Sequence, residues 1–146
     1  IFMEGRTRMS TVIRPEVSEN NKYYISKQRY YELKHFCMQY GEWKRALKDI
    51  SSLQSLETDR DFIVVGDVAK PVEKIAELRE RYLACIEMVE KAAEETDKDL
   101  ARYLLIGVTE GVAYDFLLSR LEIPCSKDTY YDRYRRFFWI LDQSRR

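Results

Sequence analysis

Histidine, cysteine and glycine are scarce in this chain, and long hydrophobic runs are missing. Its 146 residues include one histidine, three cysteines and five glycines. His35 alone cannot build a multi-histidine metal site, and Cys37 lies two residues away, a spacing that turns the two side chains to different sides of a helix. No stretch is apolar enough for a membrane span. We therefore expect no metal, no cofactor and no membrane partner.

The cysteine pattern and the missing sequence motifs narrow the class of protein further. Cys37, Cys85 and Cys125 are odd in number and far apart, and no secretory hydrophobic segment accompanies them, so we expect a reducing, cytoplasmic setting without a disulfide framework. The sequence has no phosphate-binding loop, dinucleotide fingerprint or nucleophile elbow. It also has no pattern of paired catalytic groups, and we expect that the protein is not an enzyme.

The charges balance, which limits what a nucleic-acid site could be. Lys plus Arg and Asp plus Glu number 25 each, so the formal net charge is zero. A neutral chain lacks the general attraction to phosphates that a basic protein has, and any nucleic-acid site must therefore be local. With 45% hydrophobic and 34% charged residues, the composition is that of an ordinary globular domain.

The first half of the chain predicts an unstructured arm followed by two helices. Residues 1–20 show no periodicity and are interpreted as a flexible N-terminal arm. Ile25, Ser26 and Tyr30 then have the spacing of a hydrophobic staple around a helix N-cap. Apolar residues continue at steps of three and four as far as Ile50, and we expect Gly41 to split this stretch into two helices.

The middle of the chain predicts a loop and then a long helix. The run Phe62–Val65 is β-like but too short to found a sheet, so we expect it to pack as a loop over a helical core. Pro71 suits the first turn of a helix, and residues 72–95 carry one apolar face opposite a charged one. We divide the chain into the arm 1–20, an N-terminal helical segment with its loop over 21–70, and a C-terminal part over 71–146.

The C-terminal part predicts a helix-turn-helix. We expect Thr96 to cap a short helix that weakens at Gly107, a second short helix to end before Pro124, and Ser126 to cap a final helix over residues 127–142. A helix, a short helix, a tight turn and an aromatic-rich helix in succession form the trihelical frame of a helix-turn-helix. The predicted fold class is therefore all-α, a helical bundle with a C-terminal helix-turn-helix.

The final helix has two different faces. At about 100° per residue one face gathers an inward-facing apolar set: Tyr130, Tyr134, Phe137, Phe138 and Leu141. N-terminal residues of a recognition helix reach base edges, which predicts these readers of duplex DNA: Lys127, Asp128, Thr129, Tyr131 and Asp132. Three arginines then have the spacing to close on phosphates: Arg133, Arg135 and Arg136.

Two further readings of these residues stay open. Asp128 and Asp132 near a helix start favour the helix dipole, and Asp132 with Arg136 is an ordinary ion pair one turn apart, so the same face could simply be solvated. Tyrosines also interleave with basic residues at 22–31 and 130–136, a pattern that could stack single-stranded bases. We expect these tyrosines to be core residues with hydroxyls at the edge of the core.

The second half of the chain resembles a known family. The matching segments are DVAKPVEKIAEL, CIEMVEKAAEE and IPCSKDTYYDRYRRFFWILD, which lie between about Val65 and the C-terminus. They resemble the Firmicute phage regulators of the ArpU and RinA type, whose C-terminal part resembles region 4 of sigma-70 factors. The resemblance implies sequence-specific DNA binding in the control of phage or mobile-element genes. Ser119, Arg120 and Pro124 stand where many helix-turn-helix units have a small residue and a turn glycine.

Two functions from different classes follow. The first is a phage or mobile-element transcriptional regulator that reads duplex DNA with the helix 127–142, with the helix 72–95 as its scaffold or as the contact of a homodimer. The second is a phage accessory protein, similar to an anti-CRISPR inhibitor, that binds a host protein such as an RNA polymerase subunit or a defence nuclease. The acidic middle helix or the aromatic N-terminal helix would carry that contact, and zero net charge fits it.

Overall fold

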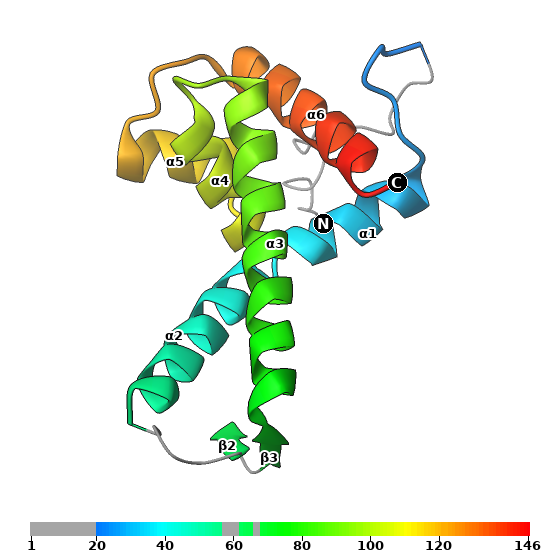
Figure 1. Cartoon of the computed structure of the whole chain (residues 1–146). Coiled ribbons are helices and arrows are strands. Elements are labelled where there is room, and N and C mark those ends of the chain that lie inside the picture. The colour runs from blue at the N-terminus through cyan, green and yellow to red at the C-terminus, as the bar shows by residue number, and fades with distance from the viewer. Residues whose placement is uncertain (1–19, 57–61, 66–67) are drawn as a thin grey trace, which may run out of the picture. The chain divides into compact units, whose positions relative to one another are not determined.

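The computed structural model describes residues 20–56, 62–65 and 68–146, and helices dominate it. The described elements are α1 (Lys27–Cys37), α2 (Tyr40–Leu56), β2 (Phe62–Val65), β3 (Val68–Pro71), α3 (Val72–Thr96), α4 (Ala101–Glu110), α5 (Tyr114–Leu121) and α6 (Lys127–Ser144) (Figure 1). The predicted all-α class is confirmed. The flexible arm predicted over residues 1–20 lies, except for Asn20, outside the described residues.

The chain forms two compact units, and one of them is discontinuous in sequence. The discontinuous unit joins the residues up to Met38 with Val89–Arg146, and the inserted unit is Gln39–Met88. These boundaries differ from the predicted ones near residues 20 and 70. The reason is that α1 packs against α4 and α6, which lie far from it in sequence.

The inserted unit contains a β-hairpin that the sequence reading did not expect. Phe62–Val65 pairs antiparallel with Val68–Pro71, and Phe62 lies opposite Pro71. The loop predicted over Phe62–Val65 is therefore wrong, because a partner strand follows two residues later and satisfies the backbone of the short run. Pro71 ends this strand rather than opening a helix, and its missing N–H is tolerated because both strands of a two-stranded sheet are edges.

The helical part of the inserted unit packs on two isoleucines. Ile50 of α2 and Ile75 of α3 are fully buried, and Leu78 and Tyr82 pack against them from α3. Leu78 and Tyr82 follow Ile75 at helical steps of three and seven, so one face of α3 supplies this core. The amphipathic helix predicted over residues 72–95 is confirmed and extends by one residue to Thr96.

Helix α1 begins directly after Ser26, the predicted N-cap. The Ser26 hydroxyl accepts a hydrogen bond from the Arg29 N–H at 3.2 Å, and the staple residues Ile25 and Tyr30 are both buried. The predicted division into two helices is also confirmed. It falls at Met38, the C-cap of α1, while Gly41 lies inside the first turn of α2.

The link between α3 and α4 is stabilised by a different residue from the predicted one. Thr96 ends α3 and donates its hydroxyl proton to the Ala92 carbonyl at 2.7 Å. Asp97 instead accepts the N–H groups of Asp99 at 3.0 Å and Leu100 at 3.2 Å. The predicted Thr96 cap of α4 is thus wrong, because the N-cap is Leu100, which has no side-chain cap, and Asp97 instead stabilises the turn that precedes the helix.

Gly107 does not weaken α4, contrary to the prediction. The helix continues to Glu110 and ends at Gly111, which has a left-handed backbone with φ 68° and ψ 33°. Gly107 is buried, and the Tyr130 hydroxyl occupies the space that a β-carbon at this position would need. The glycine therefore serves close packing between α4 and α6 rather than a break in the helix.

The turn between α5 and α6 follows the prediction. Helix α5 ends at Leu121, and Glu122 has a left-handed backbone with φ 54° and ψ 48°. Ile123 is buried, and the Ser126 hydroxyl caps α6 by accepting the Thr129 N–H at 3.2 Å. The helix end before Pro124 and the Ser126 cap are confirmed, while the helix-turn-helix itself stays a prediction.

The left-handed backbone at Glu122 gives a stability prediction. A side chain in this conformation costs about 1 kcal/mol relative to glycine. We expect Glu122→Gly to raise the free energy of unfolding by about 1 kcal/mol, measured by urea denaturation. Glu87→Gly, at an exposed site inside α3, is the matched control and should lower it by about 1 kcal/mol. A loss of stability in Glu122→Gly would contradict the assigned turn.

Candidate functional site

Helix α6 contributes buried residues to the discontinuous unit along most of its length. It contacts both α1 and α4, and Figure 1 shows it in orange to red beside the blue α1. Its buried residues are Tyr130, Tyr131, Tyr134, Phe137, Phe138, Leu141 and Asp142. The five predicted inward-facing residues are therefore all confirmed, and the structure adds Tyr131 and Asp142 to them.

Tyr131 is a core residue, and its predicted role as a reader of bases is wrong. Its side chain is 4% exposed, and its hydroxyl accepts the Tyr114 N–H at 3.2 Å. The helical wheel explains the error, because at about 100° per residue Tyr131 lies only about 20° from Phe138. A helix that packs against two neighbours buries an arc wide enough to include both rings.

Arg133 binds carboxylates of its own chain. Its Nε donates to Asp97 at 3.0 Å and its Nη1 to Asp132 at 2.6 Å. Hydrogen bonding to Asp97 raises the pKa of Arg133 above its ordinary value. Burial favours the neutral form of Asp97, but the Arg133 hydrogen bond and two backbone N–H groups outweigh it and hold the pKa of Asp97 below its usual value. Arg133 thus ties α6 to the turn before α4.

The other two predicted phosphate-binding arginines are Arg135 and Arg136. Arg135 is half-buried, and its Nε is buried without a hydrogen-bond partner among the described residues. Arg136 is half-buried as well, and its guanidinium has no ion pair within the part of the chain that the structure describes. The expected Asp132–Arg136 pair is not formed, because Asp132 pairs with Arg133.

Five of the eight predicted residues keep some exposure to solvent. We call Lys127, Asp128, Thr129, Asp132 and Arg136 the α6 polar face, and all five are exposed or half-buried. The Thr129 hydroxyl hydrogen bonds to the capping Ser126 hydroxyl at 3.0 Å. Two cations and two carboxylates balance in charge, so this face offers hydrogen-bond donors and acceptors rather than a strong positive field.

The preceding helix exposes apolar side chains. Phe116 and Leu118 of α5 are 41% and 47% exposed, and the Arg120 guanidinium lies 5.9 Å from the centre of the Phe116 ring. Exposed apolar side chains are candidates for contact with a partner protein, although two positions apart on a helix these two do not form one continuous patch. In contrast, Tyr30, Leu33 and Phe36 of α1 are buried, so this aromatic face of the N-terminal helix is not available to a partner.

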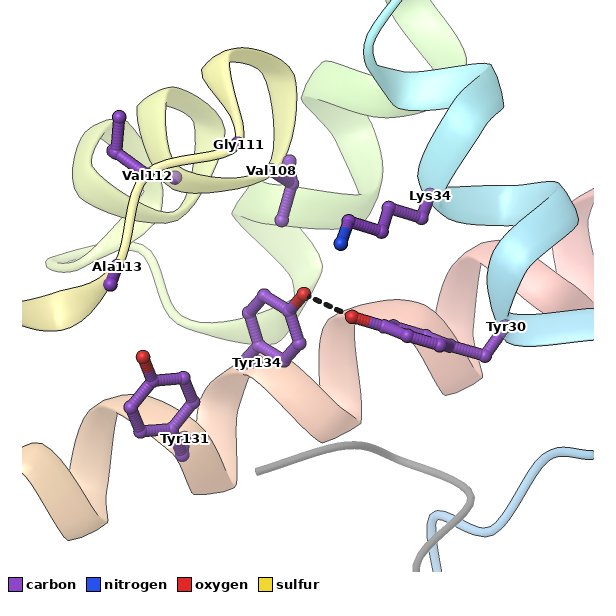
Figure 2. A pocket seen from close by; sticks show the side chains of 9 residues that line it. Tyr30, Lys34, Val108, Gly111, Val112, Ala113, Tyr131 and Tyr134 are labelled. Carbon is purple, nitrogen blue, oxygen red and sulfur yellow. Dashed lines mark hydrogen bonds between the residues drawn. The ribbon is translucent and has the colours of Figure 1, made fainter. Parts of the chain in front are cut away.

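A small pocket lies among the tyrosines of the discontinuous unit. It has a volume of about 100 Å³ and is lined by Tyr30, Lys34, Gly107, Val108, Gly111, Val112, Ala113, Tyr131 and Tyr134 (Figure 2). We call it the tyrosine pocket. The Tyr30 and Tyr134 hydroxyls share a hydrogen bond of 2.7 Å at its floor, and burial raises the pKa of Tyr134 well above its ordinary value. Tyr134 therefore stays neutral near pH 7.

A buried carboxylate joins the first and last helices of the same unit. Asp142 has a 4% exposed side chain and accepts from Arg29 Nε at 2.6 Å and from Arg146 Nη2 at 2.9 Å. Burial opposes its ionisation, but these two hydrogen bonds outweigh burial and hold the pKa of Asp142 below its usual value. Sequence reasoning missed this network, because the periodicity of α6 does not show which residue of α1 lies opposite.

Residues 20–56, 62–65 and 68–146 contain neither a cluster of metal ligands nor a membrane-spanning helix. These residues contain no group of three or more metal-ligating side chains. None of the described helices is long and apolar enough to cross a membrane. Cys37, Cys85 and Cys125 are free thiols.

No protein-family model, curated protein or solved structure matches this chain. The α6 polar face and the tyrosine pocket are two places in the discontinuous unit that offer polar groups to a partner.

Proposed function

We propose that this chain is a DNA-binding regulator of phage or mobile-element genes, with α5 and α6 as its helix-turn-helix. The observation that carries the proposal is the junction of these helices. A short helix ends in a left-handed residue, a buried Ile123 follows, and Ser126 starts a helix whose first turn carries an exposed Asp128 and a half-buried Lys127 and Thr129. Two helices joined by a short turn of this kind place the second helix for the major groove.

The groups on the α6 polar face suit contacts with duplex DNA. Asp128 and Thr129 lie in the first turn of α6, where a recognition helix reaches base edges. Lys127 and Arg136 have no ion-pair partner among the described residues, so both are available for phosphates. The resemblance to ArpU and RinA regulators supports the same assignment. With balanced charge, affinity must come from local contacts, and we expect binding to weaken moderately as salt rises, since two cations are available for phosphates.

The test is binding to duplex fragments from the gene's own neighbourhood at about 50 and 200 mM salt. We expect a fragment-selective complex that weakens with salt. Lys127→Ala with Arg136→Ala should weaken binding about tenfold and reduce the slope of log affinity against log salt by about 2, since each lost phosphate contact removes about one unit.

The matched control removes the same charges elsewhere on the discontinuous unit. Lys98, in the turn before α4, and Arg102, in the first turn of α4, are both exposed and lie outside the α6 polar face. Lys98→Ala with Arg102→Ala should therefore leave affinity and salt slope unchanged. Equal losses in both double variants, or no complex with the wild-type protein, would contradict the proposal.

A second candidate is a phage accessory protein that binds a host protein, such as a polymerase subunit or a defence nuclease. The exposed Phe116 and Leu118 on α5 favour it. The test is recovery of a host protein from nuclease-treated lysate, compared with the variant Phe116→Ser with Leu118→Ser. If the wild-type chain recovers a host protein after nuclease treatment and the variant does not, this candidate is favoured. If no host protein is recovered, the candidate loses its support.

A further inference from the structure

We propose that the tyrosine pocket binds a small monocarboxylate with a short apolar tail. The pocket is formed by α1, α4, the link from α4 to α5 and α6, all within the discontinuous unit. Its volume of about 100 Å³ exceeds the roughly 30 Å³ that one water occupies in the liquid, so it has room for a small organic ion. The proposal does not involve the α6 polar face and stands apart from DNA binding.

Lys34 supplies the charge that selects an anion. Figure 2 shows its side chain reaching from α1 toward the Tyr30–Tyr134 pair. Its Nζ lies 6.0 Å from the centre of the Tyr30 ring, and within the described part of the chain no carboxylate or other acceptor pairs with it. An ammonium group carries three donors and no acceptor. A ligand carboxylate would supply the acceptors that Lys34 lacks.

The tyrosine hydroxyls add neutral donors beside this charge. The Tyr131 hydroxyl accepts the Tyr114 N–H at 3.2 Å, which leaves its own proton to be donated. The Tyr30 and Tyr134 hydroxyls share one hydrogen bond of 2.7 Å, so one of them donates to the other and the second keeps its own proton for a ligand. Hydrogen bonds from neutral and charged donors to one carboxylate are stronger than those between neutral groups.

The remaining lining defines the size and charge of the ligand. Val108, Val112 and Ala113 form the apolar part of the wall, which suits a short hydrocarbon tail. Lys34 is the lining residue with a full positive charge. A single cation balances a monoanion, whereas a dianion such as phosphate would bring a second charge without a partner into a partly enclosed site.

The experiment is a titration with sodium propionate at neutral pH, followed by the amide signals of glycines in the nuclear magnetic resonance spectrum. Gly107 and Gly111 line the pocket, and Gly41 lies in the inserted unit as an internal control. We expect saturable shifts at Gly107 and Gly111, none at Gly41, and none with sodium chloride at equal ionic strength. Shifts that do not saturate, or that chloride reproduces, would overturn the proposal.

Two lysine variants of α1 distinguish binding of propionate in the tyrosine pocket from a general effect of positive charge. Lys34→Met keeps the apolar stem but removes the charge, and we expect propionate to bind at least about tenfold more weakly. Lys27 is exposed at the start of α1 and does not line the pocket, so Lys27→Met should bind propionate as the wild type does. Unchanged affinity in Lys34→Met, with its ligand-free glycine signals unshifted, would overturn the assignment of Lys34. Acetate binding as tightly as propionate would overturn the apolar tail.

Discussion

Replacing Gly107 by alanine is expected to lower the free energy of unfolding by about 3 kcal/mol, the upper range for overpacking a core. The added β-carbon would collide with the Tyr130 hydroxyl. The Tyr130 ring cannot retreat, because it is fully buried and packs against the rings of Tyr114, Tyr131 and Tyr134 at centroid distances of 5.9, 5.0 and 6.1 Å. Urea denaturation measures the loss.

Tyr130→Phe should rescue this variant. It removes the colliding oxygen and leaves Cζ of the ring at 3.4 Å from the new β-carbon, close to ordinary contact. The hydroxyl has no hydrogen-bond partner among the described residues, so Tyr130→Phe alone should be neutral or stabilising by about 1 kcal/mol. The double variant should therefore recover about 2 kcal/mol relative to the sum of the single changes.

The control for this cycle is the same substitution at an open site. At Gly41 the nearest atom to an added β-carbon is the end of the Arg45 side chain at 3.6 Å, so Gly41→Ala should stabilise α2 by up to about 1 kcal/mol. Additive effects of Gly107→Ala and Tyr130→Phe would contradict the close packing of α4 on α6.

Replacing Arg29 by methionine is expected to lower the free energy of unfolding by about 3 kcal/mol, because it removes the inner partner of a buried carboxylate. The Asp142 side chain is 4% exposed and that of Arg29 is 26% exposed. Arg146 contacts the same carboxylate but is 68% exposed, so Arg146→Met, the matched control, should lose less than about 1 kcal/mol. Equal losses would contradict the assigned difference between the two arginines.

The Asp142 carboxylate also makes the free energy of unfolding depend on pH. The pKa of Asp142 in the folded state lies below its ordinary value of 3.8, so its contribution is present above that value and is lost as the pH falls through the folded pKa. Unfolding free energy measured from pH 7 down to about pH 3 should therefore fall less steeply in Asp142→Asn than in the wild type. Asp97 has a shift of the same direction and should keep part of the acid sensitivity in that variant.

Local signals in the sequence predicted the helices well. Ser26 and Ser126 each precede a stripe of apolar residues, and a hydroxyl that accepts a backbone N–H fixes the helix start without help from distant residues. Pro124 stops α5 for an equally local reason. These elements depend on residues within about one turn of the signal, which is why a single sequence sufficed.

Features that depend on distant partners were missed or misplaced. Phe62–Val65 forms a strand because Val68–Pro71 pairs with it. Tyr131 is a core residue because α6 packs against two helices. The Arg29–Asp142 pair spans 113 positions of the chain, and the tyrosine pocket exists only where α1 meets α6. Periodicity shows that a face is buried but not what covers it.

Of the predicted DNA-binding residues, those at the beginning of α6 remain accessible, while Tyr131 and Arg133 are engaged within the protein. Arg133 carried no signal of this in the sequence, because its partner Asp97 precedes it by 36 positions. The helical wheel could have identified Tyr131, had the buried arc been drawn wide enough for two neighbouring helices.

The discontinuous unit has a consequence for how the protein is made on the ribosome. The Tyr30 hydroxyl bonds to that of Tyr134, 104 positions later, so α1 is translated long before α6 can cover it. At about 5–20 residues per second, the apolar face of α1 waits on the order of ten seconds without its partner. During that interval the inserted unit is translated and can fold, while the apolar face of α1 lacks the helices that cover it in the folded protein. The native packing of α1 therefore depends on α6, a helix that is synthesised much later.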